Sequence, residues 1–97
     1  MMRYTVALII TDEESKKLDA YVNQDEAFKD WFGCSKRTEI EGNAVTYLLD
    51  HVKDRYGYID KLDSYLDKVD NATFQYQVMM DDRWEMYVNQ GIYEDGI

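Results

Sequence analysis

The sequence predicts a single α+β domain in which a small antiparallel sheet of about three strands packs against three to four helices. Three observations support this fold class. The N-terminal segment alternates at period two, the middle of the chain has a helical apolar period, and a second alternating segment lies near the C-terminus. The predicted order is β-α-α-α-α-β-β. A length of 97 residues is that of one domain, residues 1–97.

The first third of the chain predicts a strand followed by two helices. Residues 3–10 alternate their apolar side chains at period two, which is typical of a strand. Thr11 and Glu14 match a capping box, in which each side chain bonds a backbone N–H group at a helix start. A short second helix over residues 26–32 is expected to end at Gly33.

The middle of the chain predicts further helix. Residues 34–43 show no clear period, but Gly42 and Asn43 suggest a helix entry with Asn43 as N-cap. Gly57 interrupts the pattern that follows, so we expect two helices or one kinked helix. The apolar residues that recur at three- and four-residue spacing are Val45, Leu48, Val52, Tyr56, Ile59, Leu62, Leu66 and Val69.

The C-terminal part predicts a β-hairpin. After Asn71 the apolar period changes from helical to two, and a strand is expected through Met80. Asp81-Asp82 would form the turn, and residues 84–88 alternate again as the returning strand.

Charge restricts the classes of partner. Twenty Asp and Glu against eleven Lys and Arg give a formal net charge of −9. Such a field repels nucleic acid and anionic membranes and favours a basic protein surface. Lys36-Arg37 is the nearest approach to a phosphate-binding cluster, with acidic residues close behind it, so direct nucleic-acid binding is not expected. The apolar run that ends at Ile10 is too short to span a membrane, which predicts a cytoplasmic protein.

A row of aspartates is the main candidate binding feature. At about 100° per residue these side chains form one stripe on a helix, with Lys61 and Lys68 on the far side. Carboxylates in such a row can take the place of phosphates in a basic groove, while a solvated helix face is the alternative interpretation. The four residues are Asp60, Asp63, Asp67 and Asp70.

Further acidic clusters and several tyrosines complete the predicted partner-binding set. The acidic residues are Asp12, Glu13, Glu14, Asp81, Asp82, Glu94 and Asp95. Tyrosine is enriched in interface hot spots, and core packing is its alternative role. The tyrosines predicted at the interface are Tyr58, Tyr65, Tyr87 and Tyr93.

Catalysis is not predicted. Cys34 and His51 are the single cysteine and histidine, and sequence spacing does not exclude that they meet in the fold. No nucleophile elbow, phosphate loop or metal-ligand spacing accompanies them. We therefore expect a protein that is not an enzyme and that uses no cofactor or metal.

Small size, strong acidity and the Asp60/Asp63/Asp67/Asp70 stripe together resemble the phage-encoded anti-defence proteins, namely the acidic anti-CRISPR inhibitors and the antirestriction DNA mimics. The resemblance covers the whole chain through its composition. It implies a stoichiometric inhibitor that acts in the host cytoplasm on the nucleic-acid-binding surface of a CRISPR effector or a restriction enzyme.

Two other function classes fit the same sequence. An immunity protein or antitoxin that neutralises a basic toxin nuclease would share the size and the acidity. A structural or assembly subunit would use the acidity for solubility alone, and it predicts a large exposed apolar patch with self-association.

Overall fold

The structure is a computed structural model that describes residues 2–40, 42–80 and, as backbone alone, 86–88. Its elements follow the order β-α-α-β-β-α-β-β, with one turn of 3₁₀ helix before the fourth strand. They are β1 (Arg3–Thr11), α1 (Asp12–Val22), α2 (Glu26–Phe32), β2 (Lys36–Ile40), β3 (Ala44–Lys53), α3 (Tyr58–Leu66), η1 (Asn71–Thr73), β4 (Phe74–Met80) and β5 (Met86–Val88).

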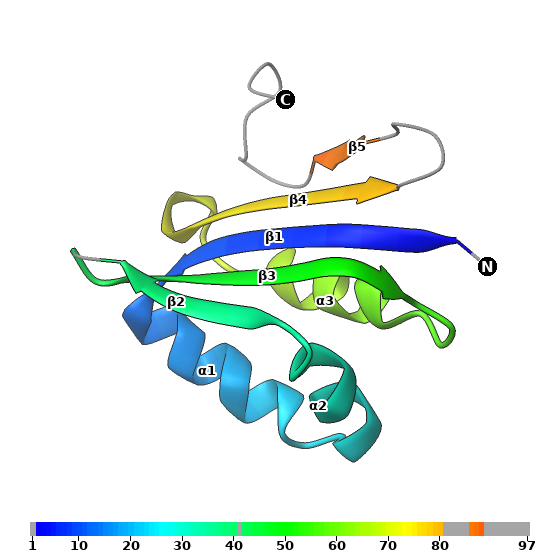
Figure 1. The fold of residues 1–97 in the computed structure, drawn as a ribbon. Helices are drawn as coiled ribbons and strands as arrows, with labels where there is room; N and C mark the ends of the chain where they lie inside the picture. The colour runs from blue at the N-terminus through cyan, green and yellow to red at the C-terminus, as the bar shows by residue number, and fades with distance from the viewer. Residues whose placement is uncertain (1, 41, 81–85, 89–97) are drawn as a thin grey trace.

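One antiparallel sheet forms the frame of the fold, with the strand order β2-β3-β1-β4-β5. The three described α-helices all lie on one face of it (Figure 1). The predicted α+β class is therefore confirmed. The predicted sheet of about three strands is too small, because the described part of the chain contributes five.

One additional strand lies in residues 34–43, for which no element was predicted, and the other replaces the helix that was predicted to start at Asn43. That prediction is wrong, because residues 44–53 form β3 and residues 36–40 form β2. The two strands pair in antiparallel register, from Lys36 opposite Leu48 to Ile40 opposite Ala44.

Backbone conformation explains why a hairpin forms here and not a helix. Gly42 has a φ of 99° and Asn43 a φ of 74°, so both lie in the left-handed region that reverses the chain. Glycine reaches this region without cost, and asparagine tolerates it better than most residues. The strand that follows alternates, with Val45, Tyr47 and Leu49 buried.

A β-bulge near the C-terminal end of β3 keeps the apolar side chains of that end on the core side of the sheet. Leu49 pairs with Val6 and Val52 pairs with Tyr4, so β3 has one extra residue between these pairs. His51 has a φ of 59° within the extra stretch, as occurs at bulged positions.

The core lies between the sheet and the helices. Each of the three central strands contributes three inward residues, and each helix contributes its apolar stripe, so that two layers enclose one core. The buried apolar residues are Val6, Leu8, Ile10, Leu18, Val22, Phe28, Phe32, Val45, Tyr47, Leu49, Ile59, Leu62, Leu66, Phe74, Tyr76 and Val78.

Local capping signals placed the first two helices correctly. The Glu14 N–H donates to the Thr11 hydroxyl at 3.2 Å, so α1 begins as predicted. Helix α2 covers the predicted residues, and Asp25 caps it by accepting from two backbone N–H groups. The C-terminal hairpin also forms, since β4 and β5 are antiparallel.

Candidate functional site

Helix α3 carries the predicted aspartate row, and Asp54 determines where that helix begins. The Asp54 carboxylate accepts from the Tyr58 N–H at 2.6 Å and from the Ile59 N–H at 3.1 Å. These are donors that a helix start leaves without an intrahelical partner. Gly57, with a φ of 77°, turns the chain so that these two N–H groups face the Asp54 carboxylate.

The row is shorter than the sequence suggested. Helix α3 ends at Leu66, so Asp60 and Asp63 lie on the helix and Asp67 is its C-cap. Asp70 has extended backbone and caps η1, accepting from the Ala72 N–H at 3.0 Å. The stripe therefore consists of three aspartates, and the fourth has a structural role.

The single lysine of α3 is directed away from the row. Lys61 donates to Asp25 of the α2 cap at 2.9 Å, and its ammonium lies 5.0 Å from the centroid of the Phe28 ring. Since Asp25 holds this lysine on the α2 side, Lys61 does not neutralise the aspartates on its own helix.

Asp63 links the row to the core. It is half-buried, and burial raises its pKa, as do the nearby charges of Asp60 and Asp67, while Tyr76 acts in the opposite direction. The pKa of Tyr76 is also raised, first by burial and then by the Asp63 charge. The two groups are close enough to influence each other. Even so, Asp63 Oδ1 and the Tyr76 hydroxyl are both buried without a well-formed hydrogen bond in the described part of the chain.

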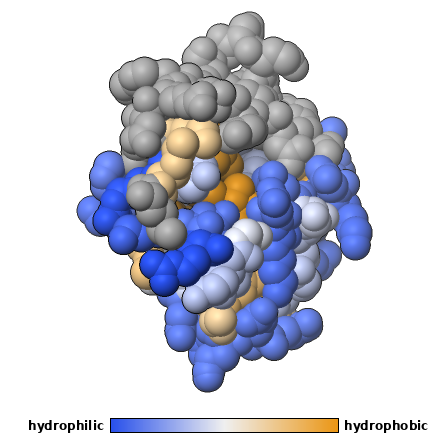
Figure 2. All heavy atoms as spheres, turned by 90° about the vertical axis from the view of Figure 1, so that its right-hand side faces the viewer, coloured by the Kyte–Doolittle hydropathy of each residue, from blue (hydrophilic) through white to orange (hydrophobic). Residues whose placement is uncertain are grey.

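Asp54, Asp60 and Asp63 together line a hollow of about 310 Å³. Tyr4 and Ile59 are among its apolar walls. It lies at the end of the sheet where β1 begins and β3 ends. Figure 2 looks onto this end and shows a largely hydrophilic surface around a small apolar area. Asp54 is therefore a member of the acidic site that the sequence did not single out.

Two of the tyrosines predicted at the interface pack against other aromatic rings of the domain. Tyr58 stacks on Phe28 at 5.5 Å between ring centroids, and Tyr65 lies 4.7 Å from Tyr21, so both rings already pack within the domain. Tyr56 was assigned to the buried helical stripe, but its exposed fraction is 73%. The glycine that follows Tyr56 was the available signal that it lies in a turn before the helix.

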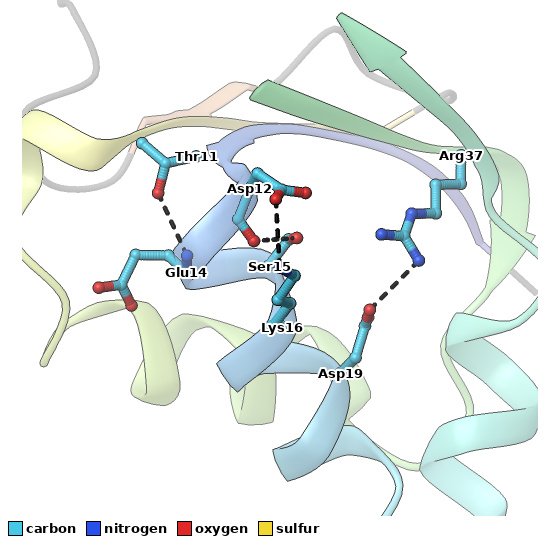
Figure 3. A network of polar contacts seen from close by, with 7 residues as sticks. All are labelled: Thr11, Asp12, Glu14, Ser15, Lys16, Asp19 and Arg37. Carbon is cyan, nitrogen blue, oxygen red and sulfur yellow. Dashed lines mark hydrogen bonds and ion pairs between the residues drawn. The ribbon is translucent and has the colours of Figure 1, made fainter. Parts of the chain in front are cut away.

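Two of the three acidic residues at the start of α1 form ion pairs, and Figure 3 shows the pair between Asp12 and Lys16. Asp12 lies 3.5 Å from Lys16, and Glu14 lies 3.5 Å from Lys17. Glu13 is exposed. The predicted α1 cluster is therefore a capped and partly neutralised helix start.

Some predicted site residues lie outside the described part of the chain. Tyr87 belongs to β5, of which only the backbone is described. The others are Asp81, Asp82, Tyr93, Glu94 and Asp95.

The residues considered for catalysis have separate surroundings. Cys34 is exposed and lines a hollow with Arg37 and Tyr47, and His51 is not among the residues that line it. Within the described ranges, no group of three or more His, Cys, Asp or Glu residues has an arrangement that could hold a metal ion. None of the helices described in the structure is long and apolar enough to cross a membrane.

In comparisons with protein-family models, with curated proteins and with solved structures, nothing matches this chain. Its function therefore has to follow from the site itself.

Proposed function

We propose that this domain is an acidic inhibitor that acts by binding and not by catalysis. In this proposal it occupies the basic nucleic-acid-binding surface of a host defence complex, as a DNA mimic does. The observation that carries the proposal is the aspartate row of α3, from which the only lysine of the helix is turned away and bound to Asp25.

The spacing of the row suits a surface that binds phosphates. Asp60, Asp63 and Asp67 are three and four residues apart, which is about 4.5 and 6 Å along a helix axis. Each duplex strand carries one phosphate per about 3.4 Å of axis, so a groove that contacts phosphates meets negative charge at a comparable spacing. Burial is the main cause of the raised pKa of Asp63, and the charges of Asp60 and Asp67 raise that pKa further, so the three carboxylates lie close enough to interact electrostatically.

Two neighbouring features extend this surface. The hollow beside Asp60 has a volume of about 310 Å³, which is large enough for a side chain of the partner. The three carboxylates that line it favour a cationic side chain there. Tyr56 is exposed and immediately precedes the first residue of the turn into α3. Tyrosine is enriched among the residues that contribute most to binding at protein interfaces.

The structure-guided test reverses charge only where side chains are exposed. Asp60 and Asp67 are both exposed, whereas Asp63 is half-buried and Asp70 caps η1. The variant Asp60→Lys/Asp67→Lys should therefore fold like the wild type. We expect it to lose at least about tenfold in affinity for the partner, since two attractive contacts become repulsive.

The matched control is Glu26→Lys/Asp30→Lys, which makes the same charge change at two exposed positions of α2. All three proteins are used as bait in host lysate, with elution by salt and identification of the captured complex by mass spectrometry. The captured complex is then tested for DNA binding in the presence of each variant.

The proposal requires that the wild type and the α2 control capture a nucleic-acid-binding complex and displace its DNA, and that the α3 variant does neither. Equal capture by the α3 variant and the wild type would overturn it. Capture of one small basic nuclease toxin in place of a defence complex would assign the domain to the immunity-protein class.

A further inference from the structure

The edge strand β2 presents an open backbone. It lies at one end of the strand order and pairs only with β3 in the described part of the chain. All five of its residues are exposed. One row of its N–H and C=O groups is therefore available to another strand, which is the situation that leads to edge-to-edge pairing.

The charge of β2 differs from that of the whole molecule. The chain carries −9, but β2 contains Lys36, Arg37 and Glu39, two positive charges and one negative charge. A basic edge attracts an acidic partner. A strand that carries charges of both signs attracts a strand on which the positive and negative residues follow in the opposite order. The reversed strand of a second copy has that order.

Pairing with a second copy selects one register. Two copies joined by antiparallel strands are related by a two-fold axis perpendicular to the sheet. Centring the pair on Arg37 or on Glu39 sets like charges directly opposite, which is destabilising. Centring it on Thr38 places Arg37 of each copy opposite Glu39 of the other.

The two charged residues project on the same face, as this register requires. Arg37 pairs with Tyr47 and Glu39 with Val45, and both of those β3 residues are buried toward the helices. Arg37 lies 3.3 Å from Asp19 of α1 (Figure 3). A guanidinium has five N–H donors, so this bond leaves donors for a second carboxylate.

We propose that two copies of this chain associate through β2, with the strands antiparallel and centred on Thr38. The two sheets then form one continuous sheet with both helix layers on the same face. This inference does not depend on the proposed function, because β2 and the aspartate row of α3 are separate surfaces.

The association is expected to be weak. The paired segment is five residues long, and two molecules of charge −9 repel each other. In sedimentation at about 0.15 M salt, the mass should rise from 11.5 kDa toward twice that value as the concentration of the full chain increases from about 10 µM to about 1 mM.

A charge-swap series tests the register. Arg37→Glu leaves two glutamates on the edge and Glu39→Arg leaves two arginines, so each variant alone should stay monomeric at concentrations where the wild type is dimeric. An equimolar mixture of these two variants should associate, since every opposed pair is again of opposite sign. The double swap Arg37→Glu/Glu39→Arg should restore the dimer of a single chain.

Rescue distinguishes the interface from damage to the fold, because Arg37→Glu also removes the bond to Asp19. A wild type that stays monomeric at about 1 mM would overturn the proposal. Dimers formed by each single variant alone would place the interface elsewhere, and a mixture that stays monomeric would exclude the Thr38-centred register. If Arg37→Glu does not dimerise but still captures the partner, the proposed function holds independently of the dimer.

Discussion

Asp63 shows how one residue connects the candidate binding surface with the stability of the domain. Its carboxylate lies partly under the surface, between two like charges and a buried tyrosine hydroxyl. Each of these surroundings except the tyrosine disfavours the charged form. An aspartate in this position is expensive to keep ionised, and the proposed binding role gives a physical reason for its presence.

The pH dependence of stability should reveal this residue. The folded pKa of Asp63 lies above its ordinary value of 3.8, so the folded state binds more protons than the unfolded state between those two values. The free energy of unfolding must then fall as pH rises through this window. We expect Asp63→Asn to be more stable than the wild type at pH 7, with the difference vanishing below pH 3.8.

Urea unfolding at several pH values measures that difference. Asp30→Asn makes the same chemical change at an exposed position, and it should alter the free energy of unfolding by less than about 0.5 kcal/mol throughout. A variant Asp63→Asn that is less stable than the wild type at pH 7 would contradict the assignment of Asp63 as a destabilised carboxylate.

At the scale of elements, the β2–β3 hairpin decides the architecture. It adds two strands beside β1 and brings Val45, Tyr47 and Leu49 against the helices. The turn between these strands depends on two consecutive residues of positive φ, Gly42 and Asn43. Its stability should therefore be sensitive to the backbone preference of the residue at 43.

We expect Asn43→Val to destabilise the domain by about 1–2 kcal/mol, because a β-branched residue is strained in the left-handed region. Asn43→Gly should stay within about 0.5 kcal/mol of the wild type, because glycine adopts this conformation freely. The midpoint of urea unfolding measures both. Equal stability of the valine and glycine variants would mean that the turn does not require a positive φ at this position.

At the scale of the whole molecule, opposite effects of charge compete. Four described ion pairs involve the helices, each between side chains that are at least partly exposed. Such pairs contribute about 0–1 kcal/mol each. Against them stands the self-repulsion of a chain that carries −9. Because the acidic excess is much larger than the number of pairs, we expect repulsion to dominate.

Salt should therefore stabilise the domain. Raising sodium chloride from about 0.02 to 0.5 M should increase the Tm by several degrees, since it screens repulsion over distances beyond a few ångströms. Asp60→Asn should raise the Tm at low salt and make no difference at high salt. A Tm that falls with added salt would show that the ion pairs outweigh the repulsion.

The fold and the site were predictable to different extents. The strand at residues 3–10, the capped helix after Thr11, the helix at 26–32 and the C-terminal hairpin follow from signals within a few residues of each other. The aspartate row was also visible, because Asp60 and Asp63 lie one helical turn apart on α3. The ends of the row were not, since the apolar helical period of the sequence continues to Val69 whereas α3 ends at Leu66.

The α+β class, the acidic character and the elements marked by caps and apolar periods all follow from signals that are local in the sequence. The conformation of residues 44–53 depends instead on contacts between distant parts of the chain. Their apolar residues fit both a helical and an alternating period, and pairing with β1 on one side and β2 on the other favours the strand. The direction of Lys61 also depends on such a contact, because Asp25, thirty-six residues away, binds the lysine and holds it on the α2 side, away from the aspartate row.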